Sequence, residues 1–298
     1  MTALYDTISF LSDAGRADEY VGVIHAVIRD LAPHVRVVDI THDIAAFDIR
    51  AGSLALARSV AYLPGGVVLA VVDPAVGTTR KAVAIEVADG EGVFVGPDNG
   101  LLAPAVAMAG GAGRAVVLDN DLYHLASPSS VASGRDLFAP VSAHLCNGVD
   151  LYELGTPIDP NELVPGVVPL PREEGDALLC EVLWIDRYGN CQLNIGPDDL
   201  AGWSSPLRIT AGEVIRVAAL APTFDVIPGG AIGLVVDGSG MYTLATARRS
   251  AAEELLLAAG DQVTVAPVGD AQAAQAVTSS VSIRLGTTRA VGTTRSDG

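Results

Sequence analysis

One stretch decides the fold of this chain: Val67-Val68-Leu69-Ala70-Val71-Val72-Asp73-Pro74. Six apolar residues in a row, most of them valine, predict a strand that is buried on both faces, as the central strands of parallel sheets are. Glycine and proline flank the run on both sides and limit it to the length of a strand. The run therefore predicts an α/β sheet with this strand near its centre.

Asp73 is one of three aspartates that stand where predicted strands stop. Asp13 follows a β-rich run at residues 7–11, and Asp39 follows another at residues 35–38. The carboxyl ends of parallel strands line one edge of a sheet, and ligands bind there. Three carboxylates at this edge predict a polar, hydroxyl-rich ligand held by hydrogen-bond acceptors. Asp13 could instead cap the next helix, but Asp18 is better placed for that role.

Strand and helix signals alternate through the first half of the chain. Apolar residues recur at helical spacing over residues 20–31 and 49–63, and a proline follows each segment. This alternation predicts an α/β domain with a mostly parallel sheet over residues 1–160. A Pro-rich stretch at residues 161–172 predicts a linker.

The second half of the chain contains only short strand signals separated by turn residues. They lie at residues 178–185, 191–195, 207–210, 214–220, 232–236, 242–245 and 263–267. This pattern predicts a small β-barrel or sandwich over residues 173–268. Residues 269–298 are rich in Ala, Gln, Ser, Thr and Gly, and we expect a mobile tail there.

The composition excludes several function classes. The 298 residues include 18 Lys and Arg against 35 Asp and Glu, a net charge of −17, so no nucleic-acid surface is expected. No apolar run approaches the ~20 residues of a membrane helix, and no basic segment opens the chain as in a secretory signal. The three cysteines have neither metal-ligand spacing nor an even disulfide framework, which favours a reducing cytoplasm.

The sequence lacks the common Gly-rich motifs for phosphate binding and the common histidine motifs for metal binding. No Gly-rich phosphate loop follows the first predicted strand, which disfavours a nucleotide with a polyphosphate. No HxH or HExxH pattern occurs, so neither a metal nor another cofactor is expected. His42 could pair with Asp39 or Asp43 as a base or a ligand, but a lone histidine in such a loop more often makes local hydrogen bonds.

The segment from Asp73 to Arg80 is the strongest single motif. It places a carboxylate at a strand end and a guanidinium seven residues later, across a turn rich in Gly and Thr. A plain ion pair is the simpler interpretation, and exposed pairs contribute little to stability. The functional interpretation is that Arg80 stabilises an attacking anion while Asp73 orients the guanidinium.

Several longer motifs carry a resemblance to a known family. They are Ser12-Asp13-Ala14-Gly15, Asp39-Ile40-Thr41-His42, Gly96-Pro97-Asp98-Asn99-Gly100, Gly134-Arg135-Asp136-Leu137-Phe138-Ala139-Pro140 and Asp186-Arg187-Tyr188-Gly189-Asn190. In this order they resemble the S-adenosylmethionine hydroxide adenosyltransferases, the adenosine-forming S-adenosylmethionine hydrolases. That family is related to the adenosyl-fluoride and adenosyl-chloride synthases.

The resemblance implies a fold, an assembly and a reaction. It implies an N-terminal α/β domain, a C-terminal β-barrel, and a homotrimer whose sites lie between the N-terminal domain of one subunit and the C-terminal domain of its neighbour. The implied substrate is S-adenosyl-L-methionine. Water or hydroxide attacks the ribose C5′ and releases adenosine and L-methionine, without a cofactor.

The resemblance also implies roles for individual residues. Asp13 would bind the ribose hydroxyls. The methionine part would contact Asp18, Tyr20, Asp186 and Ser239, and the adenine would contact Asn190, the stacking ring of Phe224 and the backbone near Arg248. Of the family's catalytic Asp–Arg–His set, Asp73 and Arg80 match the first two members. Ser133 occupies the histidine position, and a serine can bind a water but is no base near neutral pH.

Two other functions remain open from the sequence. A halogenase of the same superfamily would transfer halide to C5′, but the resemblance implies that those enzymes lack the Asp/Arg pair, and the Asp73 carboxylate would repel a halide. A non-catalytic adenosine or S-adenosylmethionine binding protein is the other alternative, because of Ser133. Chromatography of the products formed from S-adenosylmethionine separates the three functions.

Overall fold

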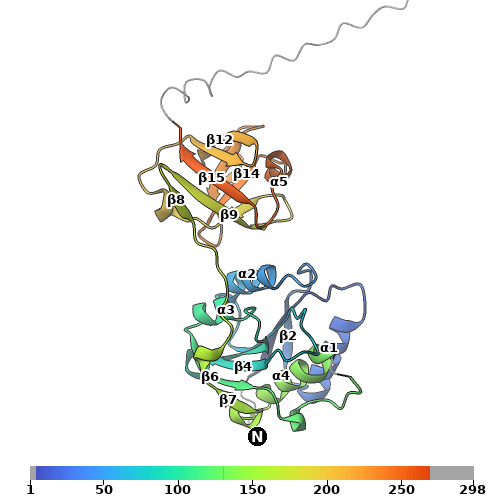
Figure 1. The fold of residues 1–298 in the computed structure, drawn as a ribbon. Coiled ribbons are helices and arrows are strands. Elements are labelled where there is room, and N and C mark those ends of the chain that lie inside the picture. The colour runs from blue at the N-terminus through green and yellow to red at the C-terminus, as the bar shows by residue number, and fades with distance from the viewer. Residues whose placement is uncertain (1–4, 130, 269–298) are drawn as a thin grey trace, which may run out of the picture. The chain divides into compact units, whose positions relative to one another are not determined.

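The computed structural model describes residues 5–129 and 131–268, which form two compact units that divide between Leu170 and Pro171 (Figure 1). The expected tail at residues 269–298 lies outside the described residues. The domain limits given above stay a prediction.

The first unit is built on a seven-stranded sheet with the strand order β2-β1-β3-β5-β4-β6-β7. The strands are β1 (Thr7–Ser12), β2 (Arg36–Thr41), β3 (Gly66–Val71), β4 (Ala82–Val87), β5 (Gly92–Pro97), β6 (Ala112–Val117) and β7 (Thr156–Ile158). Neighbours from β2 to β5 pair in parallel, whereas β4 is antiparallel to both β5 and β6, and β7 is antiparallel to β6. Five of the seven strands thus run in one direction, which confirms the mostly parallel α/β sheet.

Helices cover both faces of this sheet (Figure 1). The α-helices are α1 (Tyr20–Leu31), α2 (Ile49–Val60), α3 (Ala103–Met108) and α4 (Ala139–Cys146). Short helical turns lie at η1 (Ala88–Gly90), η2 (Asp121–Tyr123), η4 (Leu151–Glu153) and η5 (Pro160–Glu162), and η3 (Gly134–Phe138) is a π-helical turn directly before α4.

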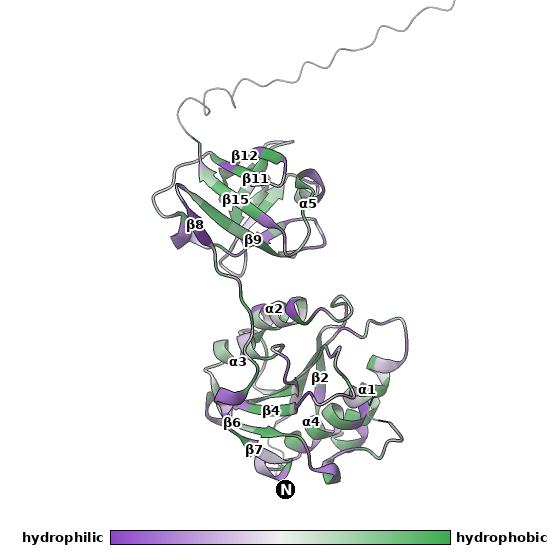
Figure 2. Cartoon of the chain, in the orientation of Figure 1, coloured by the Kyte–Doolittle hydropathy of each residue, from purple (hydrophilic) through white to green (hydrophobic). Residues whose placement is uncertain are grey.

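The apolar run of β3 is explained by two separate cores. Val67, Leu69 and Val71 point to the core that contains Ile24 of α1 and Val141 of α4. The alternate residues, Val68 and Ala70 of the strand and Val72 directly after it, belong to the core that contains Leu56 of α2 and Val106 of α3. Successive side chains of a strand face opposite sides, so a strand between two helix layers needs apolar residues at every position. Figure 2 shows the resulting hydrophobic strands.

One local expectation differs from the structure. Asp39 lies inside β2, which continues to Thr41, and not beyond its end. The π-helical turn stands directly before α4, and such a turn is a local form often found at functional sites. The three-residue strand β7 was not predicted because so short a segment has no measurable periodicity.

The second unit is a closed β-barrel. Its strands are β8 (Arg172–Glu174), β9 (Ala177–Ile185), β10 (Cys191–Leu193), β11 (Leu207–Ala211), β12 (Val214–Leu220), β13 (Ile232–Val236), β14 (Tyr242–Thr246) and β15 (Gln262–Pro267), with α5 (Ala251–Leu255) and the turns η6 (Pro197–Leu200) and η7 (Phe224–Val226). β10 pairs with both β14 and β9, which closes seven strands, while β8 pairs only on the outside of β9. Of the two folds predicted for this half of the chain, the β-barrel is therefore confirmed and the sandwich is excluded.

No helix among the described residues is long and apolar enough to cross a membrane. The three cysteines, Cys146, Cys180 and Cys191, are buried and form no disulfide. Burial raises the pKa of each thiol to about 12, so these cysteines are packing residues and not nucleophiles.

Candidate active site

A hollow of about 380 Å³ opens at the carboxyl end of β1 and β3 in the first unit. We call it the N-terminal hollow. Its lining includes Asp13, Asp18, Tyr20, Phe47, Asp73, Ser133 and Gly134. The sequence assigned five of these residues to the site: Asp13, Asp18, Tyr20, Asp73 and Ser133. Asp39, the third strand-end aspartate, does not line the hollow.

Asp73 and Arg80 form a buried two-pronged ion pair. Arg80 Nε donates to Asp73 Oδ1 at 3.1 Å, and Arg80 Nη2 donates to Asp73 Oδ2. The side chains are only 4% exposed for Asp73 and 10% for Arg80, so solvent screens this pair far less than a surface pair. The Arg80 guanidinium also lies 5.5 Å from the centre of the Phe138 ring, which supports its plane. The arrangement fixes a positive charge beside the hollow.

The end of β3 is held in place by the Gly96–Gly100 turn. Asn99 Nδ2 donates to the Val72 carbonyl at 2.9 Å, and Asn99 Oδ1 accepts from the Leu101 amide. A Cβ atom on Gly96 would stand 2.3 Å from the Ala70 carbonyl oxygen, so only glycine fits against β3. This turn therefore fixes the backbone from which the Asp73 side chain reaches the hollow.

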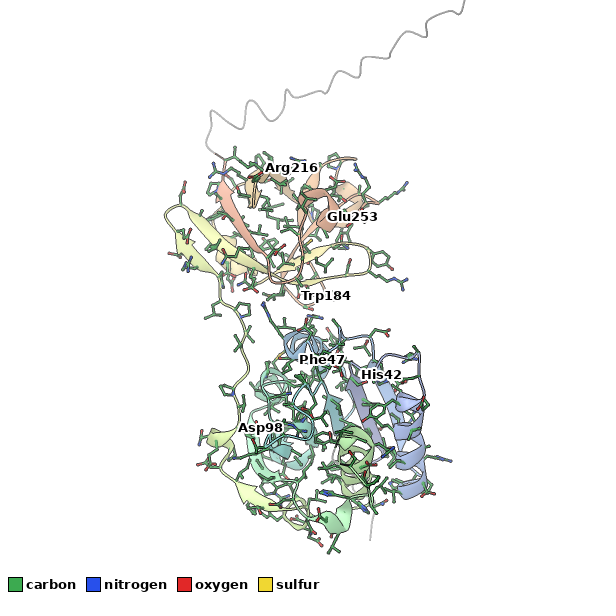
Figure 3. All side chains as sticks on the ribbon, turned by 45° about the vertical axis from the view of Figure 1, so that its right-hand side comes forward. His42, Phe47, Asp98, Trp184, Arg216 and Glu253 are labelled. Atoms are coloured by element: carbon green, nitrogen blue, oxygen red, sulfur yellow. The ribbon has the colours of Figure 1, made fainter. Side chains whose placement is uncertain are left out.

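Asp13 is anchored from the neighbouring loop. The Phe47 amide donates to Asp13 Oδ2 at 2.8 Å, and Phe47 lies in the loop before α2 (Figure 3). Phe47 has a φ of 69°, which costs energy for a residue other than glycine, and its side chain is 71% exposed. Strain of this kind is often found at ligand sites. The sequence assigned no role to Phe47, although it follows the Asp39-Ile40-Thr41-His42 motif closely.

Asp18 and Tyr20 stand at the start of α1. Asp18 Oδ1 accepts from the Tyr20 amide at 3.1 Å, while Glu19, the residue at the cap position, makes no such bond. The Tyr20 ring lies against Gly134, where an added Cβ would come within 2.5 Å of the phenol oxygen. Burial raises the pKa of the Tyr20 phenol above its ordinary value. The phenol of Tyr20 is therefore neutral near pH 7, and it lines the hollow as a hydrogen-bonding group.

A second hollow, of about 590 Å³, lies at one end of the barrel, and we call it the C-terminal hollow. Its lining comprises Asp186, Tyr188, Asn190, Phe224, Thr246, Arg248, Arg249 and Ser250. Four of these were assigned from the sequence, namely Asp186, Asn190, Phe224 and Arg248, and they come from three separate segments. Ser239 is not among the lining residues: it is exposed in the turn between β13 and β14, where its amide donates to Asp237.

The turn between β9 and β10 shapes this hollow. Asp186 Oδ1 accepts from the amides of Tyr188 and Asn190, and Asp186 Oδ2 accepts from Asn190 Nδ2 at 2.7 Å. Gly189 has a φ of 82°, and a Cβ there would stand 2.1 Å from Ser250 Oγ, so the tight turn needs glycine. Asp186 thus organises the turn and presents Asn190. Tyr188, 72% exposed, was missed although it lies within the same motif.

Family comparisons agree with this division into two halves. A model of the SAM hydroxide adenosyltransferase N-terminal domain matches residues 8–155, and one of the C-terminal domain matches residues 180–264. The chain belongs to the SAM hydroxide adenosyltransferase family. Both hollows lie within the matched residues.

Three similar proteins illustrate the range of this family. An (R)-S-adenosyl-L-methionine hydrolase from Salinispora tropica is 42% identical, over 87% of this chain and 97% of its own. A fluorinase from Actinoplanes sp. is 28% identical over 87% of this chain and 96% of its own. The crystal structure of an uncharacterized conserved protein from Thermotoga maritima superposes with a TM-score of 0.80, at 32% identity, over 87% of this chain and 99% of that one.

Ser133 is where this member of the family departs from the expected catalytic set. It stands directly before the π-helical turn and lines the N-terminal hollow. It also lines an adjacent hollow of about 580 Å³ that contains His124 and Asp121. His144, by contrast, packs edge-on against Tyr123 at 5.1 Å, and burial lowers its pKa, as expected of a core histidine.

Proposed function

We propose that this chain hydrolyses S-adenosyl-L-methionine to adenosine and L-methionine. The observation that carries the proposal is the buried ion pair of Asp73 and Arg80, in which Asp73 lines the N-terminal hollow together with Asp13. The names of the relatives specify the (R) form of the substrate, and we propose the same preference here.

The chemistry needs little from the protein beyond placement and charge. The substrate is a sulfonium, so methionine departs as a neutral thioether and takes the C–S electron pair without an acid. The new bond joins a water oxygen to the ribose C5′, and the water loses one proton to solvent and keeps the other in the new 5′ hydroxyl. Attack requires an oxygen about 3–3.5 Å from C5′ and opposite sulfur. Arg80 favours the anionic, hydroxide-like form of this oxygen, and Asp73 holds the guanidinium in place.

Product analysis tests the proposal directly. The chain is incubated with S-adenosyl-L-methionine in water labelled with heavy oxygen, in the presence of chloride and fluoride. We expect adenosine that carries the label in its 5′ hydroxyl. A 5′-halo-adenosine would instead indicate a halogenase, and binding without any product would indicate a non-catalytic binding protein.

We further propose a homotrimer in which the two hollows complete each other across subunits. The support is the distribution of the assigned residues: Asp13, Asp73 and Ser133 line one unit's hollow, and the adenine candidates line the other's. We propose domain limits of 1–160 and 173–268 for the two halves, and a cytoplasmic location because the three thiols are unpaired.

Mixing two inactive variants tests the shared site. Arg80→Ala disables the N-terminal hollow, and Asn190→Ala with Phe224→Ala disables the C-terminal hollow. Co-expressed trimers that share sites should regain activity in about a quarter of their sites, because a site from two intact halves forms at that frequency in a random mixture. Light scattering checks the mass of the assembly. A mixture that stays inactive, or an active monomer, contradicts the shared site.

Asp13→Ala should weaken the binding of both S-adenosylmethionine and adenosine. The ribose hydroxyls lose their acceptor and the Phe47 amide loses its partner, which together cost about 1–3 kcal/mol. Calorimetric titration with adenosine measures the loss. Asp43→Ala is the matched control, because it removes the same charge from an exposed loop residue outside the hollow. Equal adenosine affinity for Asp13→Ala and the parent chain would refute the ribose role.

A further inference from the structure

Three side chains that could hold a metal ion gather outside both hollows. They are His25 of α1, Asp39 of β2 and His42 just beyond β2, and among the described residues they form the cluster whose donor atoms all lie within 4.8 Å of one another. His25 Nε2 is 2.8 Å from Asp39 Oδ1, and His42 Nε2 is 3.1 Å from the same oxygen. Figure 3 labels His42 on the first unit.

His42 carries the feature that points to a ligand. Its side chain is completely buried, its Nδ1 lies 2.8 Å from Ser12 Oγ, and the centre of the Phe10 ring lies 4.5 Å from the centre of the imidazole, with the two rings tilted by 60°. Its Nε2 has no hydrogen bond of proper geometry, although it faces Asp39. If Nδ1–H donates to Ser12, Nε2 presents a lone pair towards a carboxylate. A buried lone pair beside a carboxylate is satisfied by a cation between them.

Asp39 is suited to be the third ligand. Its outer oxygen, Oδ2, accepts from Arg16 at 3.1 Å, which leaves Oδ1 turned towards the two imidazoles. Ser12 and Arg16 thus hold the outer atoms of two ligands, as the surrounding groups of protein metal sites do.

We propose that His25, Asp39 and His42 bind a divalent first-row transition ion of the zinc type. Two imidazole nitrogens and one carboxylate oxygen suit zinc, whereas calcium and magnesium prefer oxygen ligands alone. Zinc bonds to these atoms are about 2.0–2.2 Å long, so the three donors need to separate only slightly to surround the ion, and a water completes the tetrahedron.

The site would act on the loop that carries the substrate candidates. The Gly15 amide donates to the His42 carbonyl at 2.8 Å, and Gly15 lies between Asp13 and Asp18. An ion on His42 would therefore tie α1 and β2 to that loop. The proposal concerns metal binding and stands apart from the proposed hydrolysis.

Zinc binding by the full chain tests the proposal. Metal-free protein is titrated with zinc alone by calorimetry, and cobalt is used in parallel because a tetrahedral cobalt site absorbs visible light. We expect one ion per chain and a higher unfolding temperature with zinc present. His25→Ala should weaken zinc binding by at least about tenfold and abolish the cobalt band, since it removes one of three ligands. His34→Ala is the matched control, an exposed histidine outside the cluster.

Each outcome decides the matter. Binding that is lost in His25→Ala and kept in His34→Ala supports the site. No zinc bound by the parent chain at micromolar concentration, or equal affinity in His25→Ala, overturns it. Circular dichroism checks that the variant folds. If His25→Ala does not fold, His25→Gln and Asp39→Asn provide the same two readouts.

Discussion

Replacing Arg80 with alanine is expected to reduce the turnover number for adenosine formation by about 10²–10³-fold, the usual cost of losing one preorganised donor to a developing charge. The guanidinium is held in place by two hydrogen bonds to Asp73 and by the Phe138 ring, so it is such a preorganised donor. Substrate affinity should change much less, because Arg80 acts on the attacking oxygen and not on the substrate.

Arg114→Ala is the control for this prediction. Arg114 lies in β6, forms a two-pronged pair with Glu86 and lies 5.1 Å from the Tyr152 ring, yet its partner Glu86, unlike Asp73, does not line the N-terminal hollow. Both variants lose an arginine from a carboxylate and an aromatic ring. Only Arg80→Ala should lose activity. Thermal unfolding is recorded for each, since the unpaired Asp73 carboxylate could cost about 3–5 kcal/mol of stability. Adenosine formation that survives Arg80→Ala refutes the catalytic role.

Much of the fold follows from the apolar runs and turn residues of the sequence. The apolar run of β3 predicted a central strand because a strand between two helix layers has no exposed face. The strands predicted for the second half of the chain agree with those of the barrel because turn residues bound each of them. What the sequence did not decide was closure of the barrel, since closure depends on the pairing of β9 with β10 across a short turn, and periodicity carries no information about pairing partners.

The site was predictable where its residues are close in sequence. Asp73 and Arg80 lie across one turn, so their spacing relates them, whereas Asp186 and Asn190, which lie within another turn, were assigned only through the resemblance. Asp39 was wrongly placed at a strand end because the predicted strand stopped three residues early, and its side chain faces His25 and His42. That cluster joins a helix to a strand through the tertiary fold, and no local spacing reveals it.

The replacement of Ser133 by histidine is expected to raise the turnover number by at least about tenfold. A positioned base or water-orienting group is typically worth ~10²–10⁴-fold, and a serine hydroxyl cannot act as a base near neutral pH. Ser133 lines the N-terminal hollow directly, and at about 380 Å³ the hollow has room for an imidazole. Michaelis constants should change little, because the new group would act on the attacking water.

The pH dependence identifies the cause of such a gain. A base must be unprotonated, so the activity of Ser133→His should rise as pH increases through the ordinary imidazole pKa of about 6.5, a step that a serine cannot produce. Ser129→His is the matched control: it places the same ring in the same loop, in the hollow of His124 but not in the N-terminal hollow. Steady-state rates across pH for the parent chain and both variants test the argument. A parent chain that is faster than Ser133→His would mean that Ser133 itself serves the reaction, with the water activated by Arg80 and oriented by the serine hydroxyl.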